Sequence, residues 1–116
     1  MKKYADNKLK KSWGVLFLAG IFEVGYALSV AGSHAFTKLN WSILALVFFI
    51  LTLYTLSISL KYINVGVGYA VWAGIGTIGA SIFGFVLFHQ QLSLIQIFWL
   101  VIIIIGVIWL KISDSN

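Results

Sequence analysis

One acidic side chain stands where the sequence offers little water. Glu23 lies in the stretch GIFEVGYA, residues 20–27, inside a long apolar run. An ionised carboxylate is energetically costly in such surroundings. If the apolar run crosses a membrane, Glu23 therefore indicates a site that binds protons or cations. The alternative is a protonated Glu23 that only holds a neighbouring helix. At helical spacing its face carries mostly small side chains and one hydroxyl: Leu16, Ala19, Gly20, Tyr26, Ala27 and Val30.

Two aromatic residues form a second candidate feature. Tyr69 and Trp72 are three residues apart, so on a helix they share one face. Their rings could be ordinary packing. Beside a buried carboxylate they would also suit a cation, because phenol and indole faces attract desolvated positive charge.

Three hydroxyls follow a stripe at i, i+3 and i+7: Thr52, Thr55 and Ser59. In membrane helices such hydroxyls commonly donate to the carbonyl four residues earlier, and we expect this of Thr55 and Ser59. For Thr52, at the depth expected to face Glu23, a bond within its own helix and a place in the site both stay open.

Small residues mark the segment that carries the aromatic pair. The rows are Gly66, Ala70 and Gly74, then Gly76, Ala80 and Gly84. Such rows let helices approach closely in lipid. The chain has no proline, so glycine must supply any bend, and we expect a hinge at Gly74 and Gly76.

The composition indicates a membrane protein. Of 116 residues 61% are hydrophobic and 9% are charged, against roughly 25% charged in soluble domains. Cysteine is absent, which excludes disulfides and thiolate metal sites. His34 and His89 have no second ligand at metal-site spacing, and no nucleophile–base pair or phosphate loop can be assembled. We therefore expect no cofactor, no resident metal and no enzyme activity.

Four apolar segments are long enough to span a bilayer, which takes about 20 residues each. They are expected at about 13–31, 41–60, 65–88 and 92–110. The sequence thus predicts an all-α membrane protein with one four-helix domain over 13–111, a basic tail over 1–12 and a short tail over 112–116. A cleaved signal peptide is the competing reading of the first segment. Glu23 and the near-full span length argue against it.

Lysines are distributed unequally between the two predicted sides. The first side carries seven: Lys2, Lys3, Lys8, Lys10, Lys11, Lys61 and Lys111. Only Lys38 lies on the other. The positive-inside rule then predicts both termini in the cytoplasm. The tail has no aromatic–basic interleaving, so membrane anchoring fits it better than nucleic-acid binding.

Nearly the whole chain, from Trp13 to Lys111, resembles the small multidrug resistance family of bacterial inner-membrane exporters. The likeness rests on GIFEV at residues 20–24 and YAVWAGIG at residues 69–76. It implies four-helix subunits that pair antiparallel, with the fourth helix dimerising, for which Gly106 is the close-approach point. It also implies proton-coupled cation export, with Glu23 binding protons or substrate. The expected lining of the site is Tyr69, Trp72, Tyr26, Thr52, Gly20 and Phe49.

Several departures leave the substrate branch open. The glycine-rich third segment resembles the guanidinium exporters, but Tyr26 stands where that branch has tryptophan. Phe49 stands where the multidrug branch has tyrosine. The main expectation is a proton-coupled exporter of quaternary ammonium or other small organic cations, with polyamines also open and guanidinium export as the alternative.

The lysine bias leaves two options open. Either the chain is one subunit of a heterodimer, since a chain that inserts in one orientation supplies an antiparallel homodimer poorly, or the basic tail counts for less than its number of lysines suggests. A non-transporting assembly subunit is the alternative class, in which Glu23 and the small-residue rows only join helices.

Overall fold

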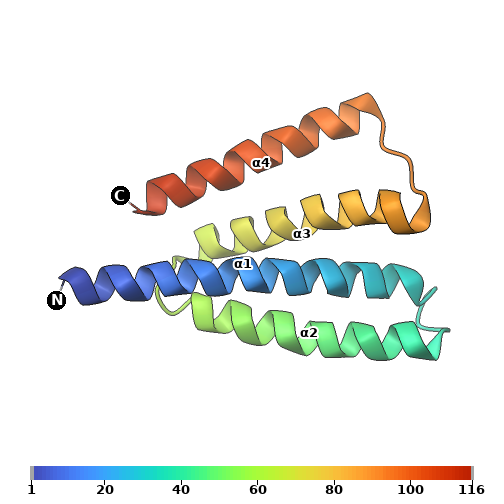
Figure 1. Ribbon diagram of the computed structural model, residues 1–116, viewed down its shortest axis with the longest axis horizontal. Coiled ribbons are helices and arrows are strands. Elements are labelled where there is room, and N and C mark those ends of the chain that lie inside the picture. The colour runs from blue at the N-terminus through green and yellow to red at the C-terminus, as the bar shows by residue number, and fades with distance from the viewer. Residues whose placement is uncertain (1, 116) are drawn as a thin grey trace.

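The chain forms four helices. The computed structural model describes residues 2–115, with side chains for residues 7–113. The helices are α1 (Lys2–Gly32), α2 (Leu39–Ser59), α3 (Val65–Phe88) and α4 (Leu94–Ser115) (Figure 1). No strand occurs between residues 2 and 115, so the predicted all-α class is confirmed.

Each helix is long and apolar enough to cross a membrane. The spanning stretches are Asn7–Gly32, Leu39–Ser59, Val65–Phe88 and Leu94–Ser113. Helix α1 continues back through the segment expected as a tail, and α4 begins two residues later than the fourth predicted segment. Backbone hydrogen bonding need not stop where hydropathy changes, which explains helices longer than their apolar runs. The chain is a multi-pass membrane protein.

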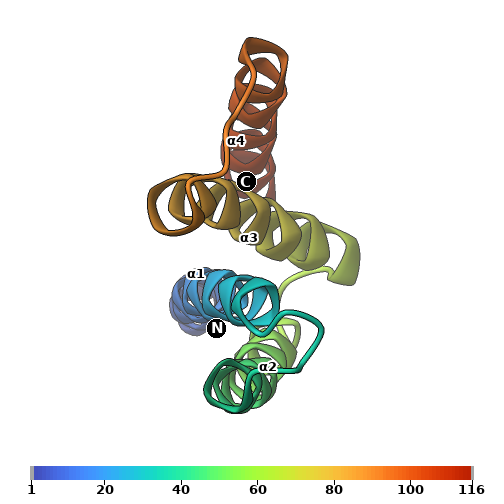
Figure 2. The ribbon, with the colours of Figure 1, turned by 90° about the vertical axis from the view of Figure 1, so that its right-hand side faces the viewer.

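Helix α1 lies between α2 and α3 and packs against both (Figure 2). Helices α2 and α3 touch each other only slightly, and α4 packs mainly against α3, with Lys111 Nζ 5.6 Å from the centre of the Trp13 ring of α1. The subunit is a flat slab, with principal extents of 51 × 34 × 18 Å. Helix α1 therefore organises the fold.

The apolar core lies near the turn that joins α2 to α3. It is built from six buried side chains: Trp13, Leu16, Ala19, Leu56, Ile63 and Val71. Their burial fixes the position of α1 between its neighbours at this end of the subunit. Helix α4 contrasts with this, since none of the residues in its membrane-spanning stretch is buried within the subunit.

The connection between α1 and α2 has an unusual backbone. His34, Ala35 and Phe36 have positive φ angles of 48°, 60° and 63°, which is uncommon for residues other than glycine. Ser33 Oγ accepts a hydrogen bond from the Phe36 amide at 3.0 Å. Thr37 Oγ1 donates to the His34 carbonyl at 2.8 Å. These side-chain bonds hold the left-handed turn.

Candidate functional site

Glu23 opens into a cavity between α1 and α3. The cavity has a volume of about 280 Å³. Its lining residues are Glu23, Ala27, Trp72, Ala73, Gly76, Thr77 and Ala80. The five from α3 follow helical spacing on one face, so two helices build the whole pocket. Glu23 supplies its only carboxylate among these residues, and Trp72 its only aromatic ring.

Gly76 makes room for Glu23. A Cβ atom at Gly76 would lie 2.7 Å from Glu23 Cγ and 3.4 Å from Glu23 Cβ. The first distance is shorter than real Cβ contacts, so only glycine lets the Glu23 side chain take this path. Gly76 was expected as a hinge, and its contact with Glu23 was not foreseen.

Trp72 is held by a chain of hydrogen bonds that joins three helices. Its indole Nε1–H donates to Thr52 Oγ1 at 2.8 Å. Thr52 Oγ1 in turn donates to the Ala19 carbonyl of α1 at 2.8 Å, and Thr52 is 1% exposed. Thr52 therefore bonds between helices and not to the carbonyl four residues earlier, and it supports Trp72 without itself lining the cavity. The indole N–H thus has its hydrogen-bond partner within the protein, and this bond fixes the orientation of the ring.

The other two hydroxyls of the α2 stripe bond within their own helix. Thr55 Oγ1 donates to the Leu51 carbonyl at 2.8 Å, four residues earlier, as expected. Ser59 Oγ donates to the Leu56 carbonyl at 2.7 Å, three residues earlier. Neither side chain reaches α1 or α3 through these bonds.

Tyr69 extends the aromatic surface beyond the cavity. Its ring packs edge-to-face on Trp72, with centroids 5.1 Å apart. It is not among the cavity-lining residues, and 49% of it is exposed. The structure thus brings the aromatic pair together beside the pocket, with Trp72 inside it and Tyr69 at its edge.

Tyr26 and Phe49 line a different cavity. Their rings pack with centroids 5.5 Å apart. They share a hollow of about 320 Å³ with residues of α2 and the α1–α2 connection, namely Phe36, Ser42, Ala45 and Leu46. Within one subunit these two expected lining residues therefore border a different cavity from the one that Glu23 lines.

Three other expected glycines serve helix contacts or lie in open space. A Cβ at Gly20 would lie 2.5 Å from Ile75 Cγ2, so α3 covers this position. A Cβ at Gly74 would meet Val107 of α4 at 2.6 Å. Gly106, expected to dimerise, has nothing within 4 Å of such an atom. Helix α3 runs unbroken through Gly74 and Gly76.

Ala27, which the sequence placed on the Glu23 face, lines the cavity, but three other lining residues were not singled out as part of a site. They are Ala73, Thr77 and Ala80. The signal was present, since stepping along a helix from Trp72 by one, four, five and eight residues reaches Ala73, Gly76, Thr77 and Ala80. No group of three or more His, Cys, Asp or Glu suited to a metal occurs among the described residues.

The comparison with known proteins agrees with this architecture. The sequence model of the small multidrug resistance protein family matches residues 11–103. The chain belongs to the small multidrug resistance family. The match includes Glu23, Thr52 and Trp72, so the residues that build and support the cavity lie within its family part.

Curated relatives cover nearly all of this small multidrug resistance protein. A guanidinium exporter of Proteus vulgaris is 35% identical over 103 residues, which are 89% of this chain and 99% of the relative. One of Yersinia pestis is 38% identical with the same coverage. One of Salmonella typhimurium is 39% identical over 102 residues, 88% of this chain and 97% of the relative. The protein is thus a membrane transporter of this family.

Proposed function

We propose that the protein exports small organic cations in exchange for protons, with Glu23 as the group that binds each in turn. The observation that carries the proposal is the shared cavity of Glu23 and Trp72 between α1 and α3. It places a carboxylate and an indole in one small hollow within membrane-spanning helices. An assembly role alone would not call for such a hollow.

The chemistry of exchange follows from charge neutralisation. An ionised carboxylate in apolar surroundings is costly unless a partner neutralises it. A proton neutralises Glu23 by forming the carboxyl group, and an organic cation does so by pairing with the carboxylate. The two ligands therefore compete for one side chain. The aromatic face of Trp72 stabilises the cation after it loses water, while its N–H stays bonded to Thr52.

Coupling requires that the site opens to one side of the membrane at a time. Proton entry from the outside then releases the cation there, and cation binding from the inside releases the proton. The contact between Gly76 and Glu23 lies in the stretch of α3 proposed as the hinge. A movement of this stretch would change how the Glu23 side chain packs against α3, which supports the hinge assignment at Gly74 and Gly76.

Guanidinium is the first substrate to test. The relatives of this chain in Proteus vulgaris, Yersinia pestis and Salmonella typhimurium carry the name guanidinium exporter. This name favours a small cation. A quaternary ammonium remains the comparison substrate, because Tyr26 departs from the tryptophan of the guanidinium branch.

The working unit that we propose is an antiparallel dimer in the bacterial inner membrane. The exposed α4 and its open Gly106 position support a contact with a second subunit. The partner is either a second copy or a paralogous subunit.

Transport by the purified chain tests the proposal. The protein is reconstituted alone in proteoliposomes with an imposed pH gradient, and uptake of guanidinium is compared with uptake of tetramethylammonium. We expect gradient-driven uptake that Glu23→Gln abolishes, because glutamine keeps the shape but cannot exchange a proton. Proton-driven uptake by a folded Glu23→Gln protein would contradict the role of Glu23. Uptake only after a paralogous subunit is added would identify a heterodimer.

A further inference from the structure

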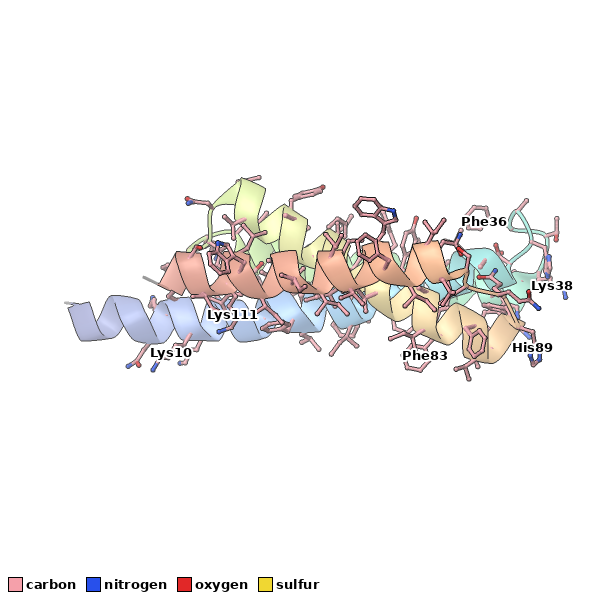
Figure 3. The ribbon with its side chains drawn as sticks, turned by 90° about the horizontal axis from the view of Figure 1, so that it is seen from above. Lys10, Phe36, Lys38, Phe83, His89 and Lys111 are labelled. Atoms are coloured by element: carbon pink, nitrogen blue, oxygen red, sulfur yellow. The ribbon has the colours of Figure 1, made fainter. Side chains whose placement is uncertain are left out.

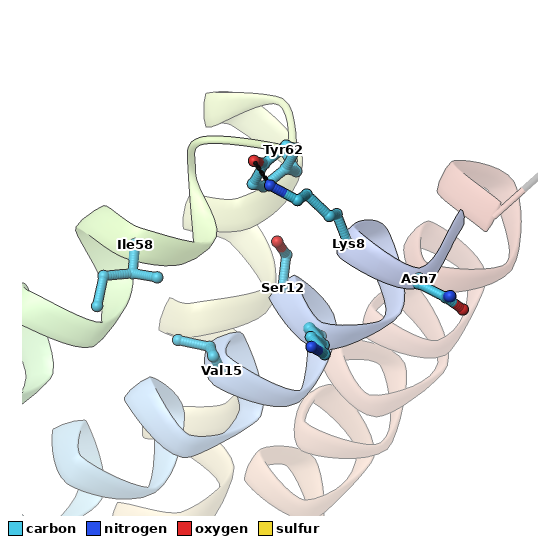
Figure 4. A pocket seen from close by; sticks show the side chains of 7 residues that line it. Asn7, Lys8, Ser12, Val15, Ile58 and Tyr62 are labelled. Carbon is cyan, nitrogen blue, oxygen red and sulfur yellow. Dashed lines mark hydrogen bonds between the residues drawn. The ribbon is translucent and has the colours of Figure 1, made fainter. Parts of the chain in front are cut away.

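A separate cavity lies at the N-terminal end of α1, beside the turn that joins α2 to α3 (Figure 4). Its volume is about 420 Å³. Its lining residues are Asn7, Lys8, Lys11, Ser12, Val15, Ile58 and Tyr62. The Glu23 cavity shares none of them, so this hollow needs its own explanation.

The lining changes from polar to apolar along the helix axis. Lys8 and Lys11 stand toward the end of α1, and Val15 with Ile58 forms the apolar part. From Lys8 to Val15 the helix rises about 10 Å, at roughly 1.5 Å per residue. A phospholipid makes the same change over a similar depth, from charged headgroup to acyl chain. None of the seven described lining residues is acidic.

The charged part of this cavity is held in place by a contact between two segments. Lys8 Nζ donates a hydrogen bond to Tyr62 Oη at 3.1 Å. The same ammonium lies 5.4 Å from the centre of the Tyr62 ring. Tyr62 belongs to the α2–α3 turn, so the contact joins that turn to α1 (Figure 4). The lysine is thereby positioned over the cavity.

Part of this cavity lies outside the family match. That match begins at residue 11, so Asn7 and Lys8 precede it. The cavity also lies at the end of the subunit that carries most of the lysines. Basic pockets between membrane helices suit the headgroups of anionic lipids.

We propose that this cavity binds an anionic phospholipid. Lys8 and Lys11 pair with the phosphate, and the start of an acyl chain lies along Val15 and Ile58. An organic cation is disfavoured here because two lysines would repel it. Free phosphate would use the lysines but would gain nothing from the apolar wall. The occupant that uses both parts of the lining is a membrane lipid.

Native mass spectrometry of the full chain in detergent tests this proposal. The protein is titrated with phosphatidylglycerol, with zwitterionic phosphatidylcholine, and with inorganic phosphate as competitor. The decisive variant is Lys11→Gln, and the matched control is Lys10→Gln. Both side chains are exposed and both changes remove one charge, but Lys10 does not line the cavity. Exposure of both positions favours normal folding of both variants.

We expect retained phosphatidylglycerol, with affinity about fivefold lower for Lys11→Gln and less than about twofold lower for Lys10→Gln. Equal losses in the two variants would overturn the proposal, since they would indicate only general attraction to positive charge. Equal retention of phosphatidylcholine would also overturn it. Displacement of the lipid by inorganic phosphate at comparable concentration would identify an anion site instead. None of these outcomes depends on transport, so they are separable from the role of Glu23.

Discussion

At the scale of single residues, Gly76 places a steric constraint on Glu23. The missing side chain of Gly76 is what allows Glu23 Cγ to lie against α3. The carboxylate therefore depends on a residue with no chemistry of its own. This contact also links Glu23, the proposed exchange group, to Gly76 in the proposed hinge. A substitution at either residue should therefore change the conformation of the other.

Gly76→Ala should impair transport more than folding. The new Cβ would lie 2.7 Å from Glu23 Cγ, which forces the acidic side chain to move. A displacement of about 1 Å in a site can lower activity by up to about 100-fold, so we expect uptake to fall by at least about tenfold. Alanine favours a helix over glycine by about 1 kcal/mol, so α3 itself should persist. Initial uptake rates in proteoliposomes measure the effect.

Gly66→Ala is the matched control for this change. It lies in the same helix, and its added Cβ would meet nothing within 4 Å. We expect near-normal uptake from it. If both variants transport equally well, the position of the Glu23 side chain does not depend on glycine at residue 76.

The sequence identified Glu23 and Trp72 more securely than their surroundings. A single carboxylate in an apolar run can be recognised from the sequence, because its energetic cost in a membrane indicates a function. Which glycine faces which helix is not visible, because it depends on how the helices cross. Gly20 and Gly76 illustrate this, since Ile75 covers one and Glu23 lies against the other. Tyr26 and Phe49 were likewise expected to line the site with Glu23, and within one subunit they pack together and line a neighbouring cavity.

At the scale of helices, Thr52 connects α2 and α3, which otherwise make little contact. The Thr52 hydroxyl bonds both to Trp72 of α3 and to the Ala19 carbonyl of α1. It thereby sets the position of the cavity's aromatic wall from outside the cavity. We regard Thr52 as a positioning residue for Trp72.

Thr52→Val should weaken cation binding and lower stability, whereas Thr52→Ser should retain most of both. Valine keeps the shape but loses the hydroxyl, so two interhelical bonds disappear. Such bonds in membranes are worth about 0.6 kcal/mol on average, so we expect a loss of about 1 kcal/mol in unfolding free energy. Unfolding in detergent and guanidinium binding by calorimetry measure the two effects.

Thr55→Val separates the positioning role from the general loss of a hydroxyl. Thr55 bonds only carbonyls of its own helix, those of Leu51 and Thr52, in the bonds described here. We expect its cation affinity to stay near that of the wild type. Equal cation affinity in Thr52→Val, Thr52→Ser and the wild type would rule out a positioning role for Thr52.

The positions of α2 and α3 were predictable to within about two residues, because apolar length decided them. The third predicted segment, 65–88, coincides with α3, because a spanning helix must satisfy its own backbone in lipid. The left-handed turn at His34, Ala35 and Phe36 was not predictable. None of the three positive-φ positions is a glycine, and the bonds from Ser33 and Thr37 that hold the turn appear only in three dimensions.

At the scale of the whole molecule, the two ends of the subunit differ in charge. Lys10 and Lys111 lie toward one end, and Lys38 lies at the other (Figure 3). Seven of the eight lysines belong to the first end by the order of the four spans. The positive-inside rule then favours one orientation. A chain with one orientation cannot by itself supply both halves of an antiparallel dimer.

A reporter fused to the C-terminus should therefore detect one orientation, with the terminus in the cytoplasm. Changing the five N-terminal lysines to glutamine leaves two lysines against one, and we expect this variant to insert in both orientations because the bias is nearly removed. Paired fusions to alkaline phosphatase and green fluorescent protein measure the two populations. A single orientation in the wild type, together with uptake only in the presence of a paralogous subunit, would favour the heterodimer. A mixed wild-type population would show that the basic segment counts for less than its charge suggests, and a homodimer would then need no partner.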